Sequence, residues 1–183
     1  MGLYKYSMKA ADEREFARAQ AYDLNCSYKD LSQVLAALKG KTVAQARKVL
    51  DECISLKMPI AFHKFHTGMG HRSQLGGRKG KFPKKEAKIA LALLKNAESN
   101  ADFKGLDAGS LVVVQAASFK QNVMPRYRRT FATPVVLGYG KQAIWANYVT
   151  ARAEIVLGKP PERKRGANGK NRKAGVKQVK KQG

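Results

Sequence analysis

The sequence predicts an α+β fold, in which three helices pack on a small antiparallel sheet that carries a long protruding β-hairpin and a disordered basic tail. Three observations predict this class. Apolar residues recur at helical spacing behind three helix-start signals, a long stretch near the C-terminus alternates apolar with polar residues, and the final segment has few large apolar side chains. We expect an N-terminal arm over residues 1–16, one domain over residues 17–158 and a tail over residues 159–183.

The first two expected elements are a strand and a helix. Ala17, Ala19 and Ala21 alternate with larger side chains, as in a strand. The stretch SYKD, residues 27–30, is an acidic variant of the capping box and predicts the start of a helix. Apolar residues follow at helical spacing, and Gly40 is placed to end that helix.

Two further helices are expected. Thr42 and Gln45 can form a capping box for the second helix, which should end before Pro59. Pro83 suits the first turn of the third helix. The apolar face of that third helix comprises Ala87, Ala90, Leu91, Leu94 and Ala97. Its polar face carries Lys84, Lys85, Lys88 and Lys95.

Two strands flank a long connection near the C-terminus. Residues 111–114 are apolar and β-branched, and strict alternation over residues 145–157 predicts a long strand with one face on the core. A hairpin turn needs only about two to five residues, far fewer than this connection has. We therefore expect an extended hairpin over residues 111–157. Its ribbon, from about residue 120 to about residue 143, would project about 35 Å and be marginally stable alone.

The charge of the chain is strongly unbalanced. The chain carries 36 Lys and Arg against 13 Asp and Glu, a formal net charge of +23, which favours a polyanionic partner. Nucleic acid fits best, because neutralising phosphates releases counterions. An anionic membrane surface would require a basic amphipathic helix, whereas the basic segments here are rich in Gly and Pro. No membrane insertion is expected.

The cations concentrate where acids are absent, over residues 53–85 and 108–153, and in the tail. The first gap contains a basic Gly-rich loop, residues 63–82, whose glycines would let backbone N–H groups approach phosphates. The candidate RNA-binding residues in and beside this loop are Lys64, His71, Arg72, Arg78, Lys79, Lys81, Lys84 and Lys85. Those of the hairpin and tail are Lys120, Arg126, Tyr127, Arg128, Arg129, Lys141, Arg152, Arg163, Lys164 and Arg165. The alternatives are a solvated basic loop and a bare linker.

Catalytic and metal sites find little support. Cys26 and Cys53 fall in or beside predicted helices, where small buried side chains are expected. The three histidines, His63, His66 and His71, have no carboxylate near them in the sequence and lack the paired spacing of zinc ligands. We expect no catalytic residue, no metal and no cofactor. The absence of a signal-like or membrane-spanning apolar run predicts a cytosolic protein.

Several segments together resemble a universal large-subunit ribosomal protein family, number twenty-two in the bacterial series and seventeen in the older eukaryotic one. The stretch SYKDLSQVLAALKGKTVAQARKVLDECI resembles its helical opening, and LALLKNAESNADFKGLD resembles a distinctive segment of archaeal and eukaryotic members. MPIAFHKFHTGMGHRSQLGGRKGKFPKKEAK is similar to the Gly-rich basic insertion of those members. MPRYRRTF, followed by an alternating strand, is similar to the family hairpin. The resemblance covers roughly residues 17–157.

The resemblance implies a structural constituent of the large ribosomal subunit that binds large-subunit rRNA. It also implies that the hairpin reaches inward between RNA domains and helps line the polypeptide exit tunnel. The implied partners are large-subunit rRNA, neighbouring large-subunit proteins and the nascent polypeptide. The sequence departs from the family after the Arg run, where FATPVVLGYGKQA is more apolar and less basic than family hairpins, so the tunnel-facing side chains are not carried over.

Two other functions are compatible with a basic surface. A nucleic-acid-modifying enzyme would need a metal site or an acid–base pair in addition to it. A free-standing architectural DNA-binding protein would prefer duplex DNA over structured RNA.

Overall fold

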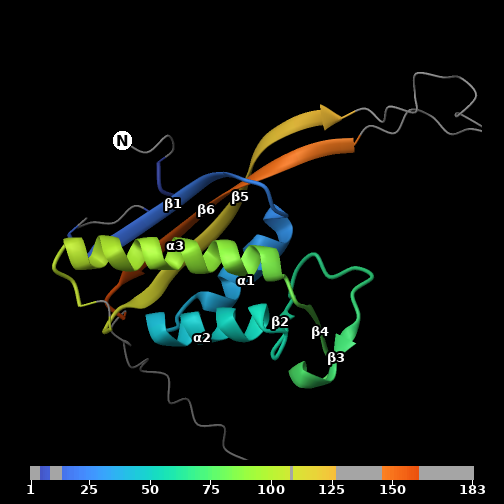
Figure 1. Ribbon diagram of the computed structural model, residues 1–183, viewed down its shortest axis with the longest axis horizontal. Helices are drawn as coiled ribbons and strands as arrows, with labels where there is room; N and C mark the ends of the chain where they lie inside the picture. The colour runs from blue at the N-terminus through green and yellow to red at the C-terminus, as the bar shows by residue number, and fades with distance from the viewer. Residues whose placement is uncertain (1–4, 9–13, 108, 127–145, 161–183) are drawn as a thin grey trace, which may run out of the picture.

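A three-stranded antiparallel sheet is the frame of the molecule, and three helices cover one of its faces (Figure 1). The computed structural model describes residues 5–8, 14–107, 109–126 and 146–160. The strand order is β1-β6-β5, with β1 at Phe16–Leu24, β5 at Val112–Arg126 and β6 at Ala146–Gly158. The predicted α+β class is therefore confirmed.

Side-chain hydrogen bonds start the first two helices where the sequence predicts. In α1, Tyr28–Leu38, the backbone N–H of Asp30 donates to Ser27 Oγ at 3.3 Å. In α2, Val43–Ile54, Thr42 and Gln45 form the reciprocal capping box. These bonds satisfy backbone N–H groups that have no partner within the helix.

Helix α3, Lys84–Phe103, lies along the sheet with a face of small side chains. Pro83 immediately precedes it, and the four predicted lysines of its polar face are exposed. Leu91 is only half-buried, whereas Leu93, which was not predicted, is buried. Helix α3 contacts β1, and buried alanines on both elements allow a close approach: Ala17, Ala19, Ala87, Ala90 and Ala97.

The segment predicted as a basic loop, residues 63–82, contains two strands of a second small sheet, and the third strand lies just before it. Its order is β2-β4-β3, with β2 at Ile60–Ala61, β3 at His71–Arg72 and β4 at Arg78–Lys81. A 3₁₀ turn, Ser73–Leu75, joins β3 to β4. Strands of two to four residues are too short to produce a clear sequence period, so pattern analysis missed them. We call residues 60–82 the Gly-rich module.

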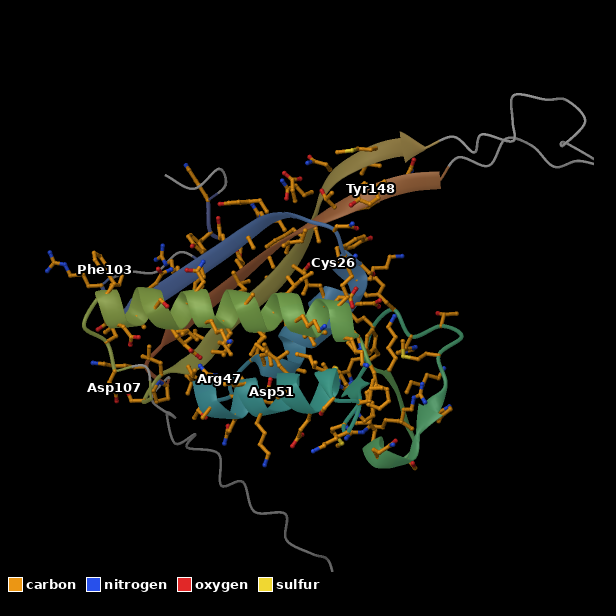
Figure 2. All side chains as sticks on the ribbon, viewed as in Figure 1. Cys26, Arg47, Asp51, Phe103, Asp107 and Tyr148 are labelled. Atoms are coloured by element: carbon orange, nitrogen blue, oxygen red, sulfur yellow. The ribbon has the colours of Figure 1, made fainter. Side chains whose placement is uncertain are left out.

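The predicted hairpin is confirmed at its base. Strands β5 and β6 stay paired from Val112 and Gly158 to Arg126 and Ala146, and they continue beyond the helices (Figure 1). Tyr148 lies on this extension (Figure 2). The rest of the predicted ribbon, residues 127–145, and the tail from residue 161 lie outside the described residues.

The uncovered face of the sheet buries one carboxylate. Glu154 is fully buried and accepts hydrogen bonds from Ser7 N at 3.2 Å, from the Ser7 hydroxyl and from Gln20 Nε2 at 3.4 Å. Residues 5–8, part of the expected N-terminal arm, are thereby attached to the sheet through Ser7. A buried carboxylate requires such partners because desolvation is costly.

Both cysteines are buried free thiols, as predicted. Burial, and secondarily the nearby carboxylate of Glu86, raise the pKa of Cys26 and of Cys53 from 9.0 to about 11. The folded state therefore holds both thiols neutral over a range of pH in which the unfolded chain ionises them.

We expect the two thiols to make the free energy of unfolding fall as pH rises from about 9 to about 11. In this range the unfolded chain ionises its thiols, whereas the raised pKa values keep both thiols neutral in the folded state. Below pH 9 their contribution is fully present. Urea unfolding of the wild type and of a Cys26→Ala, Cys53→Ala variant at several pH values measures the difference. The free energy of unfolding of the double variant should fall less between about pH 9 and about pH 11 than that of the wild type. An equal fall in both proteins would contradict the expectation.

Candidate nucleic-acid interface

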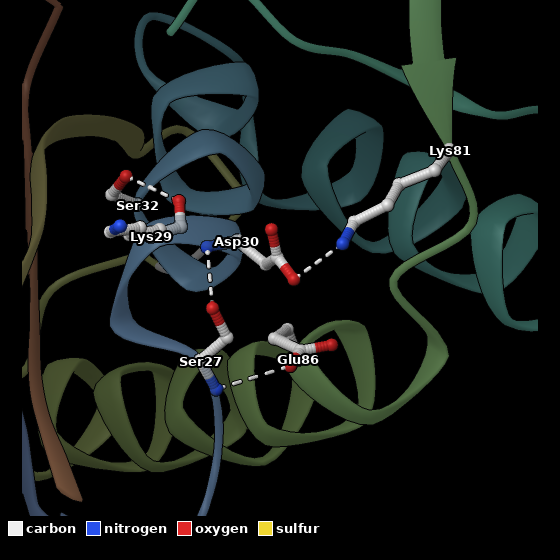
Figure 3. Close-up of polar contacts among 6 residues, drawn as sticks. All are labelled: Ser27, Lys29, Asp30, Ser32, Lys81 and Glu86. Carbon is white, nitrogen blue, oxygen red and sulfur yellow. Dashed lines mark hydrogen bonds and ion pairs between the residues drawn. The ribbon is translucent and has the colours of Figure 1, made fainter. Parts of the chain in front are cut away.

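The carboxylates beside the Gly-rich module are turned into the fold (Figure 3). Asp30 Oδ2 lies 2.6 Å from Lys81 Nζ, and the side chain of Asp30 is only 18% exposed. Glu86 on α3 is buried and accepts a hydrogen bond from the backbone N–H of Ser27 at 3.4 Å. Glu86 is therefore withdrawn from the surface, and the partly exposed Asp30 is occupied by its ion pair with Lys81.

The same contacts correct the predicted capping box of α1. In a capping box the side chain of the third helical residue, here Asp30, would bind the backbone N–H of Ser27. Glu86, from α3, takes that role, and Asp30 instead holds Lys81 of β4 (Figure 3). The contacts of Ser27 with Glu86 and of Asp30 with Lys81 thus link the start of α1 to α3 and to the Gly-rich module.

Two arginines of the Gly-rich module are held by its backbone. Arg72 Nε donates to Gly80 O at 3.0 Å, and its guanidinium lies 5.7 Å from the ring centre of Phe82. Arg78 Nε donates to Leu75 O at 3.1 Å. Because these side chains are already oriented, binding a phosphate would cost them less conformational entropy.

The other candidate residues here differ in exposure. Lys64, His71, Lys84 and Lys85 are exposed, whereas Lys79 is half-buried. The ring of His71 contacts the backbone carbonyl of Gly77. Lys81 is also half-buried, and since its ammonium is paired with Asp30, it anchors the module.

A second cationic area lies at the base of the hairpin. Lys120 is exposed, and the guanidinium of Arg152 stacks 4.5 Å from the ring centre of Phe119 on the neighbouring strand. With Gln121, these residues line a hollow of about 310 Å³. Arg126 ends the described part of β5. The remaining candidates lie outside the described residues: Tyr127, Arg128, Arg129, Lys141, Arg163, Lys164 and Arg165.

The start of α3 is more basic than its end, where the exposed Lys104 lies among exposed acids. Lys84 and Lys85 begin the helix next to the module, while Asp102 and, just beyond the helix, Asp107 are exposed at its other end. A helix of 20 residues is about 30 Å long, so these groups are well beyond the screening length of about 8 Å in physiological salt. Polyanions would meet mainly cations at the module end.

Sequence reasoning missed the aromatic partners of these cations. Phe119 lies against Arg152, Phe82 lies near Arg72, and Lys29 Nζ is 5.5 Å from the ring centre of Phe65. Such rings can stack on nucleobases where they remain exposed. The sequence signal that could have identified these partners is the presence of aromatic residues, such as Phe65, Phe82 and Phe119, within the acid-free segments.

Within the part of the chain that the structure describes, no group of three His, Cys, Asp or Glu side chains could hold a metal ion. None of the described helices has both the length and the apolar composition required to cross a bilayer.

Comparison with known proteins gives one consistent family. The family model described as Ribosomal protein L22p/L17e matches residues 19–130. A Large ribosomal subunit protein uL22 from Staphylothermus marinus is 38% identical over 141 residues, which cover 73% of this chain and 90% of that protein. The protein of that name from Archaeoglobus fulgidus is 37% identical over 73% of this chain and 89% of its own. That from Sulfolobus acidocaldarius is 30% identical over 86% and 99%.

Gly80 provides a test of whether the module must be ordered. A Cβ at this position would lie 2.5 Å from Leu75 Cδ1 and 2.6 Å from Ile60 O, so Gly80→Ala must displace β2 or β4. We expect a loss of about 1–3 kcal/mol in local stability, seen as faster amide hydrogen exchange over residues 60–82.

Gly70→Ala is the matched control, because a Cβ at Gly70 meets nothing within 4 Å. Exchange in this variant should stay close to wild type. Equal exchange in both variants would show that close packing at Gly80 does not hold the module.

Proposed function

The chain belongs to the ribosomal protein L22p/L17e family and is a structural protein rather than an enzyme. We propose that it is a constituent of the large ribosomal subunit and that it binds large-subunit rRNA. The observation that supports this most is the arrangement of charge. Asp30 and Glu86, beside the Gly-rich module, are engaged in contacts within the fold, while the cations Lys64, Arg78, Lys84 and Lys85 are exposed.

The proposed mechanism is electrostatic and architectural. Lys and Arg of the module, the hairpin and the tail neutralise phosphates and release counterions. These contacts position the protein, while the shape of the RNA supplies specificity. The candidate residues named above are proposed as the phosphate contacts, with Lys81 acting mainly through its ion pair to Asp30.

The hairpin is proposed to reach between RNA segments and to help line the polypeptide exit tunnel, where the nascent polypeptide would pass. The continued pairing of β5 and β6 beyond the helix layer supports a projecting element. A two-stranded ribbon is marginally stable alone in water, so surrounding RNA would stabilise it. Neighbouring large-subunit proteins are the other partners, and the location is the cytoplasmic ribosome.

The division into arm, domain and tail belongs to the same proposal. The domain would dock on rRNA, and the basic tail would add phosphate contacts. An architectural DNA-binding role is the second candidate, since a basic surface alone does not choose between the two nucleic acids.

The wild-type protein should bind a large-subunit rRNA transcript with an affinity that falls steeply as salt rises. Replacing both Lys84 and Lys85 with Gln should lower the slope of log K against log salt by about 1.5, since each lost phosphate contact removes about 0.7–0.9. Filter binding at several salt concentrations measures this slope.

The matched control is Lys48→Gln, Lys57→Gln, which removes the same charge from exposed positions on or just after α2, beside Asp51 and Glu52. Its slope should stay near that of the wild type. A wild-type affinity that hardly depends on salt would refute the phosphate mechanism. Tighter binding to duplex DNA than to the rRNA transcript would favour the DNA-binding alternative.

A further inference from the structure

A hollow of about 370 Å³ lies between α1, residues 63–65 and β5. Its volume falls in the range of about 300–1,000 Å³ that is usual for small-molecule sites. Small side chains, Ala36, Ala116 and Ala117, line part of it, and Lys39 and Lys64 are its cations. No carboxylate is among the described residues that line it.

Phe65 lines this hollow in an unusual backbone conformation. Its φ is +56°, in the left-handed region that bulky residues rarely adopt, and its side chain is 49% exposed. The edge-on ring of Tyr28, 6.5 Å between ring centres, and the ammonium of Lys29 orient it. An exposed ring held at the cost of backbone strain points to a binding role.

The wall that carries Phe65 is fixed to α1. Gln33 Oε1 accepts hydrogen bonds from the backbone N–H of His63 at 3.0 Å and of Lys64 at 3.1 Å. Gln33 is itself buried. The ring is therefore attached to the helix layer through its two preceding residues, which limits the entropy lost on binding.

The opposite wall is made of small side chains of β5. Ser118 lines the hollow, but its Oγ is buried and has no hydrogen-bond partner among the described residues. Ser118 is opposite Ala153 in the β5–β6 register, and Ala153 faces the helix-covered core. This wall therefore offers the small side chains of Ala116 and Ala117, and no reachable hydroxyl, to a bound group.

We propose that this hollow binds one unpaired RNA nucleobase, stacked on Phe65, with the adjoining phosphates at Lys39 and Lys64. The inference rests on the proposed RNA binding and adds a specific contact to it. Stacking accepts any base, and unpaired bases are the parts of RNA that proteins read by stacking. The lysine pair, with no carboxylate among the described lining residues, favours a nucleotide over an apolar side chain from a partner protein.

The test compares Phe65→Leu with the wild type, using the full chain, a large-subunit rRNA transcript and a fully paired RNA duplex. Leu keeps apolar bulk but removes the stacking face. We expect affinity for the transcript to fall about tenfold with an unchanged salt slope, and affinity for the duplex to stay constant. Lys64→Gln should instead lower the salt slope by about 0.7–0.9.

Phe103→Leu is the matched control, because Phe103 is 94% exposed at the C-terminal end of α3 (Figure 2). It should bind both RNAs like the wild type. Thermal unfolding checks that each variant folds. If Phe65→Leu does not fold, Phe65→Met, which also removes the stacking face, replaces it with the same expected loss on the transcript alone.

The outcomes separate this inference from the proposed function. Salt-dependent wild-type binding together with unchanged affinity of the Phe65 variant would overturn the nucleobase site and leave RNA binding intact. An equal loss on transcript and duplex would also overturn it, since the contact would not be with an unpaired base. A wild type that does not bind the transcript would refute the proposed function itself.

Discussion

Carboxylates held inside the fold are the constraint on which much of this structure depends. Asp30 joins α1 to β4 through Lys81, Glu86 joins α3 to the start of α1, and Glu154 joins residues 5–8 to the sheet. Each acid has a hydrogen-bonding or ionic partner, as an inward-facing carboxylate requires. Because these acids connect elements internally, they do not neutralise the basic surface that a polyanion would meet.

Small side chains set the distance between layers. The alanines of β1, β6 and α3 let the sheet and the long helix pack closely, and larger side chains such as Leu31, Leu94 and Ile155 complete the core. The resulting layer supports two strands that continue past the helices. A projecting ribbon needs such a base, since its distal part has few apolar contacts of its own.

The basic module is organised rather than a loose collection of charges. Backbone carbonyls orient Arg72 and Arg78, Lys81 is paired, and Gln33 fixes the segment that carries Phe65. Side chains held before binding lose less entropy when an anion arrives. The same order also creates a strained, half-exposed ring beside small residues and lysines.

Local patterns in the sequence determined the helix starts at Ser27 and Thr42 and the alternation of β6, because caps and periodicity act over a few residues. The uneven distribution of charge along the chain is also a property of the sequence alone. Tertiary structure alone decided that Glu86 would complete the first cap, that a second sheet would form in the module, and that Phe65 would border a hollow against β5. These features join residues about thirty to sixty positions apart, or depend on strands of two residues, and neither produces a periodic signal.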